Sequence, residues 1–204
     1  MNGVFEGSAL EDVKLPSTLR KIEYRAFTDC RNLKRVALPE ALERIESECF
    51  SGSGLESVRF PPALRAIGES AFRKCGELKE VAFSNGLESI GLFAFCRTGI
   101  ESVEFPPSLR TVAQGAFCMC KGLRTAKLNE GLEALGTDEY QEEGKMWCGV
   151  FEESALEEVA LPSTLRKIEY RAFENCKNLR RVLLPDGLER VGRACFLGSG
   201  LEGI

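Results

Sequence analysis

Nine cysteines give this chain its most versatile chemistry, because a thiolate can attack an electrophile, form a disulfide or bind a soft metal ion. The chain has no histidine, so a cysteine nucleophile would lack its usual base and a zinc site would lack imidazole ligands. The sequence also shows no glycine-rich phosphate loop and no serine nucleophile motif. We therefore predict a protein that is not an enzyme, with no catalytic residues, no metal site and no cofactor.

An acidic segment within residues 136–149 is the other candidate for metal chemistry. Its carboxylates have a spacing that matches no known calcium-binding loop. They are Asp138, Glu139, Glu142 and Glu143. We interpret the segment as a solvated surface loop, which also carries Trp147, the only tryptophan of the chain.

The overall composition excludes several classes of partner. A net charge of −4 gives no long-range attraction to nucleic acid or to anionic membranes. No run of residues is apolar and long enough to cross a membrane, and residues 1–20 lack the features of a signal peptide. An odd number of cysteines in no disulfide pattern favours a reducing compartment. For these 204 residues we expect a cytoplasmic protein, or a surface or secreted one if a signal peptide lies upstream of Met1 in a longer protein.

Phenylalanine recurs along the chain at nearly constant intervals, which indicates an internal repeat. The interval is 22 or 23 residues except for one of 34, and the phenylalanines are Phe5, Phe27, Phe50, Phe72, Phe95, Phe117, Phe151, Phe173 and Phe196. A fixed period in this range predicts a solenoid, because one unit cannot bury its apolar face alone. The long interval exceeds 23 by 11, so an 11-residue insertion lies within residues 136–149.

Residues 33–50 illustrate one coil of this repeat. Val36 and Leu38 alternate with polar or small residues, as in a half-buried strand, and Pro39 ends the strand because proline has no amide to donate. The arc that leads to Phe50 has room for a short second strand or for a turn or two of 3₁₀ or α-helix.

The repeat Leu-x-x-Val-x-Leu-Pro-x-x-Leu-x-x-Ile-x-x-x-Ala-Phe-x-x-Cys, as in residues 10–30, resembles the leucine-rich repeats of the BspA-like type. The resemblance implies a β-rich α/β right-handed solenoid, with a parallel concave sheet and short second strands or 3₁₀ or helical turns on the convex side. Ala41 stands where many such repeats carry asparagine, so no asparagine ladder is expected. We expect a single domain over residues 1–204, with about eight or nine coils. Its ends lack polar capping units, which predicts a fragment and allows end-to-end contacts.

Charges alternate in sign from one coil to the next in two series. The residues after the first strand leucine are Glu11, Lys34, Glu56, Lys79, Glu101, Arg124, Glu157, Arg180 and Glu202. The residues after the second leucine are Arg20, Glu43, Arg65, Glu88, Arg110, Glu133, Arg166 and Glu189. We interpret both series as structural charge ladders, because a slip of one coil would place like charges side by side.

Most cysteines are predicted to be small core residues. Cys30, Cys75 and Cys120 lie two coils apart, ~10 Å by strand spacing, which is beyond the ~7 Å between Cα atoms that a disulfide tolerates. Cys96 and Cys118 occupy equivalent places in adjacent coils and are close enough to pair. With Cys120 they form the strongest candidate for a thiol-based redox or soft-metal site, although three thiolates alone make a poor zinc site.

Two surfaces are candidates for binding a partner. Outward-facing strand positions are mixed in charge, and only Arg35, Arg59 and Arg181 are residues of a type that dominates protein interfaces. The second surface is the arc around Phe93, where other coils carry polar residues. Trp147 is predicted to fold back over this arc toward Phe93, or else to stay open and anchor a partner together with Phe93.

The resulting hypothesis is a non-enzymatic protein–protein interaction scaffold whose partner is a protein of unknown identity. The alternative is a surface adhesin or ligand-recognition domain for host or matrix proteins, as the resemblance to secreted relatives implies.

Overall fold

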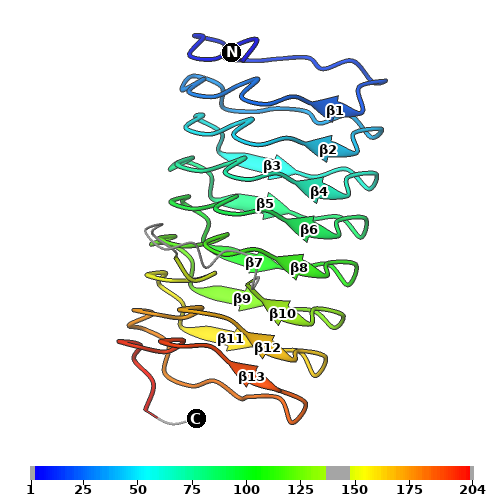
Figure 1. The fold of residues 1–204 in the computed structure, drawn as a ribbon. Coiled ribbons are helices and arrows are strands. Elements are labelled where there is room, and N and C mark those ends of the chain that lie inside the picture. Colours follow the sequence, from blue (N-terminus) through cyan, green and yellow to red (C-terminus); the bar gives the residue numbers. More distant parts are fainter. Residues whose placement is uncertain (1–2, 137–147, 203–204) are drawn as a thin grey trace.

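The computed structural model describes residues 3–136 and 148–202. The chain winds into coils that stack along one axis, so that the two ends lie at opposite ends of an elongated body (Figure 1). Hydrogen-bonded strands in neighbouring coils run parallel throughout, as expected when each coil returns to the same edge. This confirms the predicted solenoid.

The first strand of each coil follows the alternation seen in the sequence. These strands are β3 (Ser57–Arg59), β5 (Glu80–Ala82), β7 (Ser102–Glu104), β9 (Thr125–Lys127) and β11 (Glu158–Ala160). In β3, β7, β9 and β11 the central residue is buried and its two neighbours are exposed. They form a two-stranded sheet, β3-β5, and a three-stranded sheet, β7-β9-β11, and a bridge joins Lys14 to Ala37 further up the stack. We call the outward side of these strands the first-strand face.

A second set of strands forms one continuous eight-stranded parallel sheet. Its members are β1 (Lys21–Ile22), β2 (Arg44–Ile45), β4 (Ala66–Ile67), β6 (Ser89–Ile90), β8 (Thr111–Val112), β10 (Ala134–Leu135), β12 (Lys167–Ile168) and β13 (Arg190–Val191). Each strand is only two residues long, and its register pairs equivalent residues such as Ile22 with Ile45. The expected short second strands are therefore present.

Helical turns, the other expectation for this arc, do not occur in the described part of the chain, and no helix there could cross a membrane. The backbone gives the reason. Two residues before a phenylalanine of the 22- or 23-residue repeat, the chain adopts a positive φ, as at Arg25 (56°) and Phe93 (53°). It does so again two residues after that phenylalanine, as at Asp29 (56°). A helix requires successive residues with negative φ, so this alternation produces tight turns. We call the stack of these turns the turn face; it lies at the left of Figure 1.

The core is a file of stacked phenylalanines, as the repeat predicts. The ring centroids of Phe27 and Phe50 lie 5.2 Å apart, and those of Phe72 and Phe95 are separated by the same distance. A shorter file, Phe60, Phe83 and Phe105, packs against it, with an edge contact of 5.6 Å between Phe60 and Phe72. Such contacts add to the burial of the rings themselves.

Charged residues of neighbouring coils pair along both ladders. In the first series Lys34 pairs with Glu56 at 3.5 Å, and Arg124 pairs with Glu157 at 2.9 Å. In the second series Arg65 lies 3.9 Å from Glu88, and its guanidinium also donates to the Gly86 carbonyl at 2.9 Å. These side chains are largely exposed, so each pair contributes little on its own.

Replacing Phe72 by alanine is expected to destabilise the protein by about 3–5 kcal/mol, because the ring is fully buried between Phe50, Phe60 and Phe95. Chemical denaturation measures the effect. Phe5→Ala is the matched control, since Phe5 occupies the same file at the first coil but is 40% exposed. Equal losses for the two variants would show that the stacked file is not the main source of stability.

Replacing Lys79 by glutamate tests the ladder as a device that fixes coil register. Backbone hydrogen bonds place Lys79 next to both Glu56 and Glu101, so the variant sets three acidic residues in a row. We expect a loss of about 0.5–1 kcal/mol at low salt that shrinks at high salt. Lys79→Gln is the control and should cost less. A denaturation midpoint that is unchanged at low salt would contradict the prediction.

Candidate functional site

The three arginines proposed for partner binding are all exposed, and Arg59 has the most distinctive surroundings. Its register neighbour on the next coil is Ala82, and Ala37 of the preceding coil lines the same hollow. Small side chains on both sides leave the guanidinium uncovered. No ion pair or hydrogen bond of the Arg59 side chain is formed within the described residues.

Two shallow hollows meet at Arg59 on the first-strand face. The first is lined by Ser57, Val58, Arg59, Lys79, Glu80, Val81, Ala82 and Ser102. The second is lined by Val36, Ala37, Leu38, Glu40, Arg59, Phe60, Pro61, Pro62, Ala82, Phe83 and Ser84. The second hollow therefore sets valine, phenylalanine and proline side chains beside the uncommitted Arg59 guanidinium, whereas the first also holds Lys79 and Glu80.

One other positive charge at the same strand position is already paired. Lys127, which stands in β9 where Arg59 stands in β3, lies 2.6 Å from Glu104 of β7. This pairing neutralises both groups and shields them from a partner. Arg35 and Arg181 are exposed but line neither of the two hollows.

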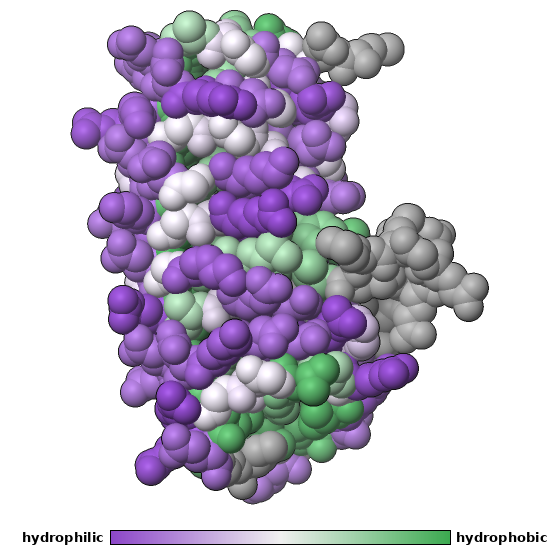
Figure 2. All heavy atoms as spheres, turned by 90° about the vertical axis from the view of Figure 1, so that its left-hand side faces the viewer, coloured by the Kyte–Doolittle hydropathy of each residue, from purple (hydrophilic) through white to green (hydrophobic). Residues whose placement is uncertain are grey.

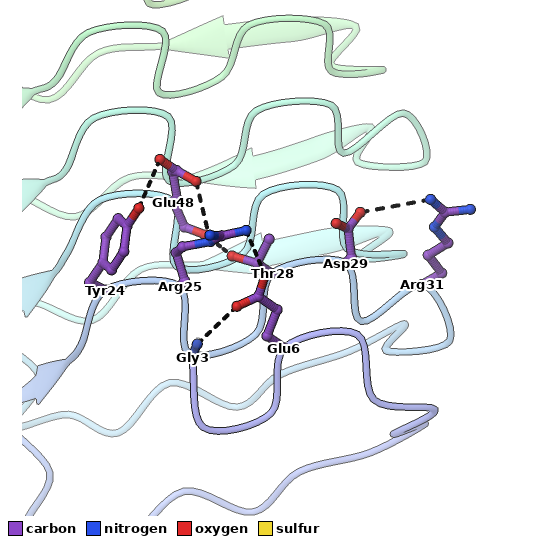
Figure 3. Close-up of polar contacts among 8 residues, drawn as sticks. All are labelled: Gly3, Glu6, Tyr24, Arg25, Thr28, Asp29, Arg31 and Glu48. Carbon is purple, nitrogen blue, oxygen red and sulfur yellow. Dashed lines mark hydrogen bonds and ion pairs between the residues drawn. The ribbon is translucent and has the colours of Figure 1, made fainter. Parts of the chain in front are cut away.

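The turn face is organised differently, by ion pairs that run from coil to coil. Figure 3 shows Arg25 between Glu6 of the preceding coil, at 2.5 Å, and Glu48 of the following coil, at 3.5 Å. Tyr24 donates its hydroxyl to Glu48, and Glu6 accepts a hydrogen bond from the Gly3 amide. The same arrangement returns near the other end of the stack.

There Arg171 lies 4.0 Å from Glu152 and 2.9 Å from Glu174. Glu152 is buried and accepts a hydrogen bond from the Gly149 amide. Burial, reinforced by Glu174, raises the pKa of the Glu152 carboxyl, although the Gly149 amide opposes the shift.

In the middle of the stack the ion pairs give way to an apolar strip. Figure 2 shows mostly polar side chains on this face and a pale green band across its centre. Phe93 is half-buried, and a Cβ atom added at Gly115 of the next coil would lie 2.4 Å from its ring. Arg73 covers the same ring at 5.6 Å. The small size of Gly115 therefore makes room for the Phe93 ring.

The predicted contact between Trp147 and Phe93 lies outside the described residues, because Trp147 belongs to the undescribed stretch 137–147. What the structure does describe beside Phe93 is a cluster of three buried thiols, which we call the thiol cluster: Cys96, Cys118 and Cys148. Cys118 and Cys96 are joined by an Sγ–Sγ contact of 2.9 Å.

The composition of this cluster corrects the sequence-based trio of Cys96, Cys118 and Cys120. Cys120 points into the core, where its thiol donates to the Phe95 carbonyl at 3.1 Å and contacts the Thr98 hydroxyl at 3.2 Å. Cys148 takes its place. It directly follows the undescribed stretch and stands three residues before Phe151, where the preceding coil has Gln114, and the fold brings it beside Cys118.

Electrostatics distinguish the three thiols. A hydrogen bond from Cys118, supported by the positive charges of Arg73 and Arg97, lowers the pKa of Cys96. Hydrogen bonds to Cys148 and Cys96, together with burial, raise the pKa of Cys118. The hydrogen bond with Cys118 lowers the pKa of Cys148. Cys118 is therefore the thiol that keeps its proton, and its neighbours are the better nucleophiles.

The remaining cysteines are core residues, as predicted. Three thiols donate a hydrogen bond to the backbone carbonyl of the repeat phenylalanine in the preceding coil, at 3.0–3.1 Å; they are those of Cys30, Cys75 and Cys176. Burial raises the pKa of the Cys75 thiol to about 11. Cys49 and Cys195 are likewise buried. Within the described residues, no group of three or more acidic or cysteine side chains is arranged to hold a metal ion.

Comparison with solved structures places the chain among bacterial leucine-rich repeat proteins. The T. pallidum leucine-rich repeat protein is similar over 92% of this chain and 76% of its own, with 26% identity and a TM-score of 0.69. A leucine-rich repeat protein from Eubacterium ventriosum is similar over 97% of this chain but 45% of its own, with 20% identity and a TM-score of 0.57. The pneumococcal vaccine antigen PcpA is 23% identical over 89% of this chain and 58% of its own, with a TM-score of 0.41.

A comparison with curated protein sequences gave no significant match. The model of the BspA type leucine-rich repeat region, in contrast, matches in six copies over residues 1–141 and 146–204. This match covers nearly the whole chain and agrees with the repeat frame, the parallel strands and the phenylalanine file described above. The chain belongs to the BspA type leucine-rich repeat family.

Proposed function

We propose that the chain is a non-enzymatic scaffold that binds a protein partner on its first-strand face, with Arg59 as the central contact. The observation that carries this proposal is the uncommitted guanidinium between a hollow lined mainly by apolar residues and one lined mainly by polar residues. An arginine beside apolar side chains has the composition of an interface hot spot, because desolvation strengthens its hydrogen bonds to a partner carboxylate.

The stacked coils support this function by making a long and rigid surface. The file of phenylalanine rings fixes the spacing of neighbouring strands, so the outward side chains of successive coils keep constant positions. A partner that contacts several coils gains affinity because binding does not have to pay the entropic cost of ordering the scaffold. The partner predicted by the charge at Arg59 presents an acidic group flanked by apolar residues.

A reducing, cytoplasmic location is part of the proposal. It is supported by the nine free cysteines and by the 2.9 Å contact between Cys118 and Cys96, two thiols that an oxidising compartment would convert to a disulfide. The adhesin alternative places the same face outside the cell and predicts binding to matrix proteins.

Replacing Arg59 by glutamate is expected to remove the partner. The measurement is affinity capture from the cell that makes the chain, with quantification of captured proteins by mass spectrometry. Wild type and the control Lys177→Glu should retain a common set of proteins, and Arg59→Glu should lose them by at least about tenfold, as for an interface hot spot. Lys177 is exposed and lies outside both hollows, and the two variants carry the same net charge.

Equal capture by the two variants would contradict the proposal. Binding of the purified wild-type chain to immobilised fibronectin or collagen, lost in Arg59→Glu, would instead favour the adhesin. Cross-links from a captured partner should map to β3 and β5, where the two hollows lie.

A further inference from the structure

The thiol cluster is independent of the first-strand face and lies just beneath the turn face. Cys96 and Cys118 each follow a column phenylalanine directly, and the rings of Phe95 and Phe117 stack 5.2 Å apart. Backbone hydrogen bonds on both sides of Cys96, from Phe95 to Ala116 and from Arg97 to Cys118, hold the two coils in register.

This spacing suits a disulfide. The Cα atoms of cysteines joined by a disulfide usually lie ~4.4–6.8 Å apart, which includes the distance between adjacent strands of a parallel sheet. The Sγ atoms already lie 2.9 Å apart, so forming the ~2.05 Å bond requires a movement of less than about 1 Å. Core cysteines such as Cys75 instead donate to backbone carbonyls and have no equivalent cysteine in the next coil.

The surroundings of Cys96 favour the thiolate that oxidation requires. Arg73 and Arg97 place positive charge near its sulfur, and Cys118 donates a hydrogen bond to it. Arg97 is exposed and its guanidinium contacts the half-buried Met119, which packs against the cluster. Cys96 itself is only 3% exposed, which admits a small oxidant more readily than a bulky one.

We propose that Cys96 and Cys118 form a reversible disulfide switch that responds to hydroperoxides. A thiol with a lowered pKa next to a second thiol that can resolve its sulfenic acid is an arrangement found in redox-sensing cysteines. Nothing in the fold requires these two thiols, because other coils place Arg73 or Glu152 at the same position after the phenylalanine.

The reaction balances with a hydroperoxide as the oxidant. The Cys96 thiolate attacks the terminal peroxide oxygen, the O–O bond breaks, and the leaving alkoxide takes up a proton and departs as an alcohol, or as water from hydrogen peroxide. Cys96 is now a sulfenic acid. The Cys118 sulfur attacks the Cys96 sulfur, the S–O bond breaks, and hydroxide leaves as water with the proton of Cys118. Two thiols and one hydroperoxide thus give one disulfide, one alcohol and one water.

The disulfide would link two neighbouring coils at the level where the insertion returns to the solenoid. Forming it removes the Cys118 proton, which serves the hydrogen bonding within the cluster. Cys148 is then placed to attack Cys118 by thiol–disulfide exchange, which releases Cys96. After this exchange Cys148 would be bonded covalently to Cys118 of the neighbouring coil, and thiol reductants would reverse the bond.

The test treats the full chain with hydrogen peroxide, alkylates free thiols under denaturing conditions and maps disulfides by mass spectrometry without reduction. We expect a peptide pair linked through Cys96 and Cys118, or through Cys118 and Cys148 after exchange, while core cysteines such as Cys75 remain alkylated. Both links should disappear with dithiothreitol. Oxidation spread evenly over all nine cysteines, or the absence of both links, would overturn the proposal.

Variants separate the roles of the two thiols. In Cys118→Ser the sulfenic acid of Cys96 should persist and react with dimedone, and in Cys96→Ser oxidation of the cluster should slow by at least about tenfold. Circular dichroism and the thermal unfolding midpoint check that each variant is folded. Cys→Ala replacements serve where serine unfolds the chain. Unchanged oxidation in a folded Cys96→Ser variant would exclude Cys96 as the reacting thiol.

A second oxidant, glutathione disulfide, tests which chemical class of oxidant the thiol cluster responds to. Glutathione disulfide reacts by exchange and must bring a bulky group to a sulfur that is 3% exposed. We expect it to oxidise the cluster at least about tenfold more slowly than an equal concentration of hydrogen peroxide. Equal rates would show that the switch responds to thiol–disulfide poise and not to hydroperoxides.

Discussion

Flat stacking of phenylalanine rings from coil to coil is the interaction on which the rest of this solenoid depends. Strands of two or three residues cannot form a stable sheet by hydrogen bonding alone. The rings of Phe27, Phe50 and Phe72 stack face to face at 5.2–5.3 Å, close to the spacing between hydrogen-bonded strands, so ring stacking and backbone pairing reinforce the same repeat distance. Core cysteines such as Cys75 complete the file by donating to the phenylalanine carbonyls.

Once the repeat distance is set, each face of the body has its own chemistry. Charge ladders and coil-to-coil ion pairs occupy most exposed charges, such as those of Arg124 and Arg25. Arg59 lies outside both ladders, and its neighbours Ala37 and Ala82 on the adjacent coils are small and uncharged. The position of Arg59 is thus distinguished by the small side chains of its neighbouring coils.

The turn face shows the same principle with different residues. Ion pairs around Arg25 and Arg171 bracket a central stretch in which Phe93, Gly115 and the thiol cluster replace the charges. Placing two thiols at equivalent positions of adjacent coils brings their sulfurs into contact without any dedicated active-site loop. The insertion adds the third thiol at the same level of the stack.

The sequence by itself determined the solenoid, the phenylalanine file, the core cysteines and the expectation of parallel strands, because a repeat of 22 or 23 residues places equivalent residues one strand spacing apart. It also predicted that Cys96 and Cys118 are close. Only the tertiary structure decided that the arc before each phenylalanine turns through residues with positive φ, that Arg59 lies between two hollows, and that Cys148 replaces Cys120 beside Cys118. The reason is physical: periodicity fixes which residues stack, but the direction of a side chain and the path of an insertion depend on contacts between segments that share no repeat position.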